Sequence, residues 1–264
     1  MRLVWATLGL FVVAGMPLAW GEEFREYWEF RYLSALPGGG FGVTPQGRVG
    51  FDGAIQLNVP VAYTPCQGNY VAGYWSASTE PREIHVGSEG AEINGTGLVA
   101  AGFGKPERGI FVANMVTSRR GESAYNAQVQ LTSDNFDKPA FAIGVVDWSG
   151  RRDRYTNLIG RGGDCRSFYG VATGRLGSDR NFVYLTLGFG NGRFNNSLFG
   201  GVSWPASDRL TVFGEYDGFN VNAGVAYSHR SRFDRGRWNV VLTGAVVDMN
   251  RPEVGACLTY APEY

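Results

Sequence analysis

Charged residues are scarce in this sequence, and neither sign of charge is in excess. Asp, Glu, Lys and Arg make up 18% of the 264 residues, with 24 acidic and 24 basic side chains, whereas about a quarter is typical of soluble domains. A chain without net charge has no field that would concentrate nucleic acid around it. We therefore expect no nucleic-acid partner.

The residues of common catalytic and metal sites are also few. His85 and His229 are the only histidines. Acid–base catalysis needs a base held near a nucleophile and a carboxylate or amide, and the spacing of neither histidine to such residues indicates a catalytic site. Cys66, Cys165 and Cys257 are too few and too scattered for a disulfide framework, and their spacing does not resemble a metal site. A bond between Cys66 and Cys165 and three free thiols both stay open. We expect no enzyme, no metal and no cofactor.

Only one long apolar run is present, and it lies at the N-terminus. Arg2 precedes the apolar stretch Leu3–Ala14, and Ala19 and Gly21 are small residues that suit a signal peptidase. The stretch is shorter than the roughly 20 apolar residues of a membrane-spanning helix, so an uncleaved anchor is the weaker alternative. The sequence predicts a signal peptide over residues 1–21 and hence export from the cytoplasm.

Glycine, aromatic residues and alternating segments are abundant instead. Gly accounts for 39 residues and aromatics for 14%, and segments of about ten residues alternate in polarity between clusters of Gly, Asn, Asp, Ser or Pro. In residues 123–133, every second side chain from Tyr125 to Leu131 is apolar, and those between are Asn or Gln. One face of such a strand suits lipid and the other water, because a cation on the lipid face costs about 2 to 4 kcal/mol near the midplane.

The number of such segments predicts the size of a barrel. Candidate strands lie at 54–64, 68–77, 96–104, 109–118, 123–133, 139–149, 164–176, 181–191, 195–204, 210–217, 219–229, 238–248 and 253–261. Bacterial single-chain barrels have an even number of strands, and Pro60 in the first candidate cannot donate to a central ladder. We predict an all-β, antiparallel transmembrane barrel of 12 strands, or of 14 if another strand lies within 24–52.

This interpretation divides the chain into three parts. The signal peptide (1–21) precedes an aromatic- and Gly-rich segment (22–53), and the barrel domain occupies 54–264. Residues 110–117 and 141–148 are apolar or mixed on both faces. That pattern is typical of strands whose inner face contacts a plug or a packed core, and it weakens the case for a wide channel.

Glu215, Asp217 and Asn222 form the candidate ligand-binding patch. Gly218 supplies the positive φ that a tight hairpin often needs. Because alternate residues of a strand share a face, both carboxylates should lie on the lumen face one pleat apart, with Asn222 on the next strand. The patch suits two roles. It could bind sugar hydroxyls or an arginine of a plug, or it could form an internal network that satisfies buried polar groups. The internal network is the favoured interpretation.

Three consecutive strands resemble those of a known family. Leu198–Trp204 contains Phe-Gly-Gly, Leu210–Gly218 contains Glu-Tyr-Asp-Gly, and Asn222–Tyr227 begins with Asn-Ala-Gly. Over this C-terminal part, the chain resembles the YjbH-like outer-membrane β-barrels, although it is far shorter than the large members. The resemblance implies a role in exopolysaccharide production or export.

These observations lead to one main function and two alternatives. The main one is a structural or exopolysaccharide-associated barrel in the outer membrane of a Gram-negative cell. Its expected partners are the lipid bilayer, the barrel-assembly machinery, and polysaccharide or envelope secretion proteins. The alternatives are a porin-like channel for small solutes and an outer-membrane lipid-modifying enzyme that would depend on His85. A secreted soluble β-sandwich is the alternative architecture.

Overall fold

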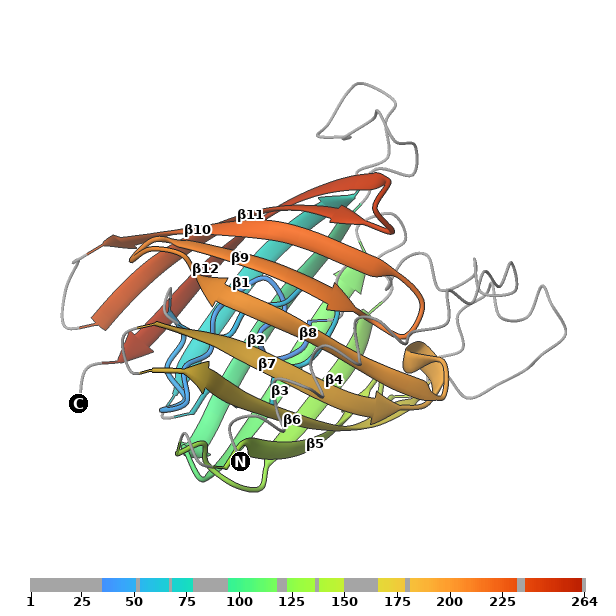
Figure 1. Ribbon diagram of the computed structural model, residues 1–264, viewed down its shortest axis with the longest axis horizontal. Coiled ribbons are helices and arrows are strands. Elements are labelled where there is room, and N and C mark those ends of the chain that lie inside the picture. The colour runs from blue at the N-terminus through green and yellow to red at the C-terminus, as the bar shows by residue number, and fades with distance from the viewer. Residues whose placement is uncertain are drawn as a thin grey trace, which may run out of the picture.

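Twelve antiparallel strands form a closed barrel in the computed structural model, which describes residues 35–50, 53–66, 68–77, 95–117, 123–135, 138–149, 166–178, 181–231 and 236–262 (Figure 1). The strands are β1 (Asn69–Ala77), β2 (Gly95–Lys105), β3 (Arg108–Thr117), β4 (Ser123–Gln130), β5 (Ala140–Val146), β6 (Ser167–Gly177), β7 (Phe182–Gly190), β8 (Ser197–Pro205), β9 (Leu210–Tyr216), β10 (Val221–Ser231), β11 (Gly236–Val247) and β12 (Arg251–Pro262). A 3-10 turn, η3 (Gly192–Phe194), lies between β7 and β8. Each strand pairs with its neighbours in sequence, and β1 pairs with β12 to close the ring.

The predicted fold class is therefore confirmed, with 12 strands rather than 14. Because the number is even, β1 begins and β12 ends at the same end of the barrel, here called the near end; the other is the far end. The first strand of the wall begins at Asn69, later than residue 54, where the sequence predicted the start of the barrel domain. The predicted signal peptide and residues 22–34 lie outside the described residues.

Apolar side chains cover the outer face of the wall. In β4, Tyr125 and Val129 are 46% and 39% exposed, whereas Asn126 is buried on the lumen side. The predicted strand over 123–133 ends at Gln130, so Leu131 is exposed in the turn beyond it. The other large apolar residues exposed on the strands include Val99, Ile110, Val112, Phe141, Ile143, Phe168, Phe189, Leu198, Val212, Val225, Leu242, Val254 and Leu258. In the described part of the chain, no helix is long and apolar enough to cross a membrane.

The N-terminal segment lies inside the ring of strands (Figure 1). We call its described residues, 35–50 and 53–66, the plug. Almost all of them are buried, and Gln46 and Arg48 in a turn are the exposed exceptions. Single bridges join Val43 to Val49 and to Ala54, so the plug satisfies part of its own backbone. One of the two mixed segments predicted to contact a plug or a packed core contacts the plug, since Phe111 of β3 packs on Phe41 with ring centroids 6.4 Å apart.

Glycines allow the plug to approach the wall closely. A Cβ atom at Gly102 of β2 would lie 2.0 Å from the carbonyl oxygen of Pro65, and a Cβ atom at Gly40 would lie 1.8 Å from the ring of Trp75. Both distances are far below van der Waals contact, so any larger residue would displace the plug. Residues 54–66 run through the lumen instead of joining the wall. Pro60 and Pro65 lack the N–H that a ladder needs. Several other amides donate to side chains of the wall, as those of Ile55 and Ala62 do, whereas those of Gln56 and Val61 donate to carbonyl oxygens within the plug.

Candidate functional site in the barrel lumen

Glu215, Asp217 and Asn222 lie together on the lumen face. Glu215 of β9 is directly opposite Asn222 of β10 in the register. The Asn222 amide donates to the Glu215 carboxylate at 2.9 Å and to the Asp217 carboxylate at 3.1 Å. All three side chains are buried. The predicted arrangement of the three residues is confirmed, and ligand binding by them stays a prediction.

The hairpin between β9 and β10 holds this arrangement in place. The other oxygen of Asp217 accepts the backbone N–H groups of Phe219 and Asn220 at 3.0 and 2.8 Å, which is how Asp commonly stabilises a turn. Gly218 has φ +99°, and a Cβ there would lie 2.6 Å from the Phe194 carbonyl oxygen. The turn therefore needs glycine for both its conformation and its space.

The Glu215 carboxylate binds the backbone of the plug. Leu57 and Asn58 donate their N–H groups to it at 2.8 Å each, and Val59 does so at 3.3 Å. Arg193 of η3 adds a contact by donating to the Asn58 side chain at 2.9 Å. The patch predicted to bind a ligand thus holds the chain's own N-terminal segment.

A row of polar side chains on β4 and β6 holds the plug midway along the lumen. Gln128 donates to the Val61 carbonyl oxygen at 3.0 Å, and Gln130 accepts from the Thr64 N–H at 2.8 Å. Thr173 of β6 accepts from the Ala62 N–H at 2.8 Å. The alternation of the sequence placed Gln128 and Gln130 on this face, but it could not identify what they bind.

Near the base of the plug, a buried tyrosine is fixed by an ion pair. The Tyr63 hydroxyl donates to Asp134 at 2.7 Å, and Asp134 also accepts from Arg175 at 2.8 Å. Burial, followed by the nearby Asp134 carboxylate, raises the pKa of Tyr63 well above its usual value, so the hydroxyl stays a donor. Sequence reasoning missed these three residues because they are far apart in the chain and lie on separate elements.

On the opposite side of the lumen, several buried polar groups have no hydrogen-bond partner among the residues that the structure describes. They include the indole N–H of Trp75, the hydroxyl of Thr243 and both carboxylate oxygens of Glu253. Gly255 of β12 is directly opposite Trp75 of β1 and Thr243 of β11, and Glu253 is one pleat away. These groups therefore lie close together. The inward position of Glu253 in the last strand was the available sequence signal, and sequence reasoning did not use it.

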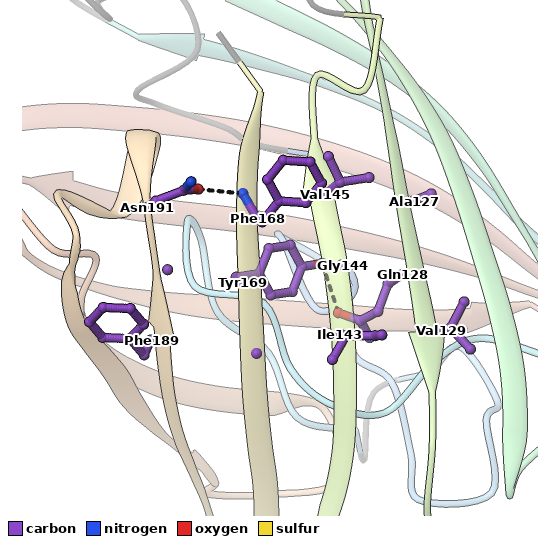
Figure 2. Close-up of a pocket in the computed structure, with 12 residues that line it drawn as sticks. Ala127, Gln128, Val129, Ile143, Gly144, Val145, Phe168, Tyr169, Phe189 and Asn191 are labelled. Carbon is purple, nitrogen blue, oxygen red and sulfur yellow. Dashed lines mark hydrogen bonds between the residues drawn. The ribbon is translucent and has the colours of Figure 1, made fainter. Parts of the chain in front are cut away.

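The outer wall has a groove over β4–β7, with a volume of about 620 Å³ (Figure 2). Its outward side chains are apolar and include Val129, Ile143, Phe168 and Phe189. Two hydrogen bonds hold the surrounding wall, as Figure 2 shows. Asn191 accepts the Phe168 N–H at 2.6 Å, and Tyr169 donates to Gln128 at 2.9 Å on the lumen side.

The remaining candidate residues that the structure describes make no hydrogen bond with Glu215, Asp217 or Asn222. His229 is exposed on the outer face of β10. His85 and Cys165 lie outside the described residues. Cys66 and Cys257 are buried free thiols. Among the residues that the structure describes, no group of three or more acidic, histidine or cysteine side chains could hold a metal ion.

The fold and the lumen contacts define a closed antiparallel β-barrel that is filled by its own N-terminal segment. No protein-family model matches the chain, and no curated protein is similar to it in sequence. Two solved structures of similar shape are a KdgM porin in complex with disordered oligogalacturonate and a Salmonella typhi outer membrane phospholipase (OMPLA) dimer with bound calcium.

Both structural similarities are distant. The porin has a TM-score of 0.47 and 8% identity, over 74% of this chain and 99% of the porin. The phospholipase has a TM-score of 0.41 and 12% identity, over 74% of this chain and 91% of the phospholipase. Similarities of this size do not transfer an activity to this chain.

Proposed function

We propose that the chain is an outer-membrane β-barrel of a Gram-negative cell envelope, closed by its plug, with a structural role or a role in exopolysaccharide production or export. The observation that carries this proposal is the pairing of an apolar exterior with a lumen occupied by the plug. Exposed Val, Ile, Leu and Phe side chains on strands around the ring suit a hydrocarbon surround, and the plug leaves the barrel without the wide polar channel of an open porin.

The exopolysaccharide role is supported by the resemblance in β8, β9 and β10 to the YjbH-like barrels. In this proposal, the Glu215 patch serves to hold the plug, and the envelope partners contact other surfaces. The barrel-assembly machinery would recognise the last strand, in which Val254 and Leu258 form an outward apolar stripe. The chain has no catalytic role in this proposal.

The membrane part of the proposal predicts heat-modifiable migration on gels. The outer-membrane fraction is extracted with detergent, and the same sample is run cold and after boiling. A closed barrel stays folded in the cold sample, so we expect two different mobilities. A protein found in the soluble fraction with a single mobility would contradict the proposal and favour a secreted β-sandwich.

The exopolysaccharide part is tested separately in a strain that lacks the gene. We expect less exopolysaccharide than in the parent strain and recovery when the wild-type gene is returned. Unchanged exopolysaccharide, together with a heat-modifiable barrel in the membrane, would leave only the structural role.

A further inference from the structure

We propose that the outer groove over β4–β7 is a binding site for one acyl chain of a membrane phospholipid, with Arg166 at its far end facing the anionic headgroup. This inference rests on the proposed membrane location, because only there does the outer wall meet lipid. It assigns a specific, retained lipid to one place on the wall.

The groove arises from a missing side chain. Gly170 of β6 lies directly between Ile143 of β5 and Phe189 of β7 in the register, and a Cβ built on it would meet nothing within 4 Å. Phe168 stands one pleat further along the same strand. Because Ile143, Phe168 and Phe189 are each more than half exposed, their side chains project outward around a glycine floor.

The floor of the groove is backed by a rigid aromatic cluster. Tyr169 points to the lumen and covers Gly144, where a Cβ would lie 2.3 Å from its ring. The Tyr169 ring packs edge-on against Phe194 and Phe199, with centroids 5.4 and 6.4 Å apart. A groove that keeps its shape loses little entropy on binding, which favours a retained ligand over a passing contact.

The chemistry of the groove selects the occupant. Its outward lining is apolar, so a hydrocarbon chain gains free energy there in proportion to the area that it buries. The polar group at its upper edge, the Asn191 amide oxygen, is already bonded to Phe168. A sugar or peptide would find few polar groups there to replace the hydrogen bonds that it makes with water.

The far end of the groove suits an anionic headgroup. Arg166 immediately precedes β6, is exposed, and donates from Nε to the carbonyl oxygen of Trp148 at 2.9 Å. Trp148 is itself 60% exposed, and tryptophan is enriched at membrane–water interfaces. The position of Arg166, beyond the apolar lining and beside an interfacial aromatic residue, provides charge complementarity to a lipid phosphate.

The test compares Gly170, which lies in the groove, with Gly244 of β11, which lies outside it. At both positions a Cβ atom would meet open space. Wild type, Gly170→Phe and Gly244→Phe are each inserted into vesicles of phosphatidylethanolamine and phosphatidylglycerol and extracted in mild detergent. Native mass spectrometry then measures the fraction of barrels that retain a phospholipid.

We expect wild type and Gly244→Phe to retain one phospholipid, and Gly170→Phe to bind it about tenfold more weakly, equivalent to about 1.4 kcal/mol. Arg166→Gln should reduce retention of phosphatidylglycerol more than that of phosphatidylethanolamine. Absence of lipid from the wild type, or equal retention by the two phenylalanine variants, would overturn the inference.

A folding check keeps this outcome separate from that of the proposed function. Each variant is run cold and boiled, and only heat-modifiable barrels are compared. Phe189→Ala, which removes one side of the groove without adding bulk, gives a second measurement and should also weaken retention. If the barrels are folded and membrane-inserted but bind no lipid, the groove inference fails alone. If the protein is soluble, the proposed function fails.

Discussion

At the scale of single residues, Glu215 and Glu253 show how hydrogen bonds decide the effect of a buried carboxylate. Glu215 accepts four hydrogen bonds, three from the plug backbone and one from Asn222. Glu253 is equally buried, but its carboxylate accepts no hydrogen bond from the residues that the structure describes. A buried polar group costs free energy unless it is paired, so the two residues should respond to the same substitution in different ways.

We expect Glu215→Gln to lower the free energy of unfolding by about 3 kcal/mol, because the amide replaces an acceptor by a donor that faces plug N–H groups. Glu253→Gln should leave the stability close to that of the wild type, since it removes a buried carboxyl group that accepts no hydrogen bond from the described residues. Urea unfolding of the detergent-solubilised barrel, followed by tryptophan fluorescence, measures both. A comparable loss in Glu253→Gln would contradict this account by showing that Glu253 has a stabilising partner.

At the scale of elements, the plug is held mainly by side chains of the wall. Its amides bind Glu215, Gln130 and Thr173, and each of these residues lies on a different strand. The plug is thus stabilised by contacts distant in sequence, which no local pattern encodes. The junction between plug and β1, at Cys66, provides a probe of its integrity.

Cys66 should react slowly with a maleimide while the plug is in place. The thiol is buried and donates to the Gln46 carbonyl oxygen at 3.5 Å, and burial raises the pKa of Cys66 to about 11 from the ordinary 9.0. At pH 8 the thiolate fraction, and with it the labelling rate, should be about a hundredfold lower than for a free thiol. A Cys165→Ser, Cys257→Ser background isolates the signal.

The same pKa shift has a consequence for stability. The folded state holds the Cys66 proton more tightly than the unfolded chain. The contribution of the protonated thiol to the free energy of unfolding is therefore fully present below about pH 9 and is lost as the pH rises towards 11. Labelling should therefore accelerate over this range. Rapid labelling of the folded barrel at pH 8 would mean that the base of the plug is open.

At the scale of the whole molecule, the plug decides whether the barrel conducts. In planar bilayers we expect the wild type to show no steady conductance, and a chain lacking residues 35–64 to form an open channel, because the polar lumen face of β4, β6 and β9 would then meet water. Gly244→Ala, on the outer face, is the control and should behave like the wild type. Steady conductance of the wild type would favour the porin-like alternative.

The strands of the barrel were predictable because each one carries its own signal. In β4 and β7, alternation separates a lipid face from a lumen face within a single segment, and the turn residues mark the ends. The lumen site was predictable only in part. Register placed Glu215 opposite Asn222, since β9 and β10 are joined by a short hairpin. The donors from Leu57, Asn58 and Val59 belong to a segment about 157 residues away, and local periodicity carries no information about them.

By itself, the sequence determined the class of the fold and the two faces of the wall, because these depend on the period of two residues along a strand. It limited the number of strands to 12 or 14. Only the tertiary structure decided that residues 54–66 enter the lumen, that Glu215 binds the plug, and that Glu253 has no hydrogen-bond partner within the described parts of the chain. The physical reason is that a backbone N–H must be satisfied wherever it is buried, but the sequence does not state which acceptor will satisfy it. Closure of the ring brings those acceptors around the plug.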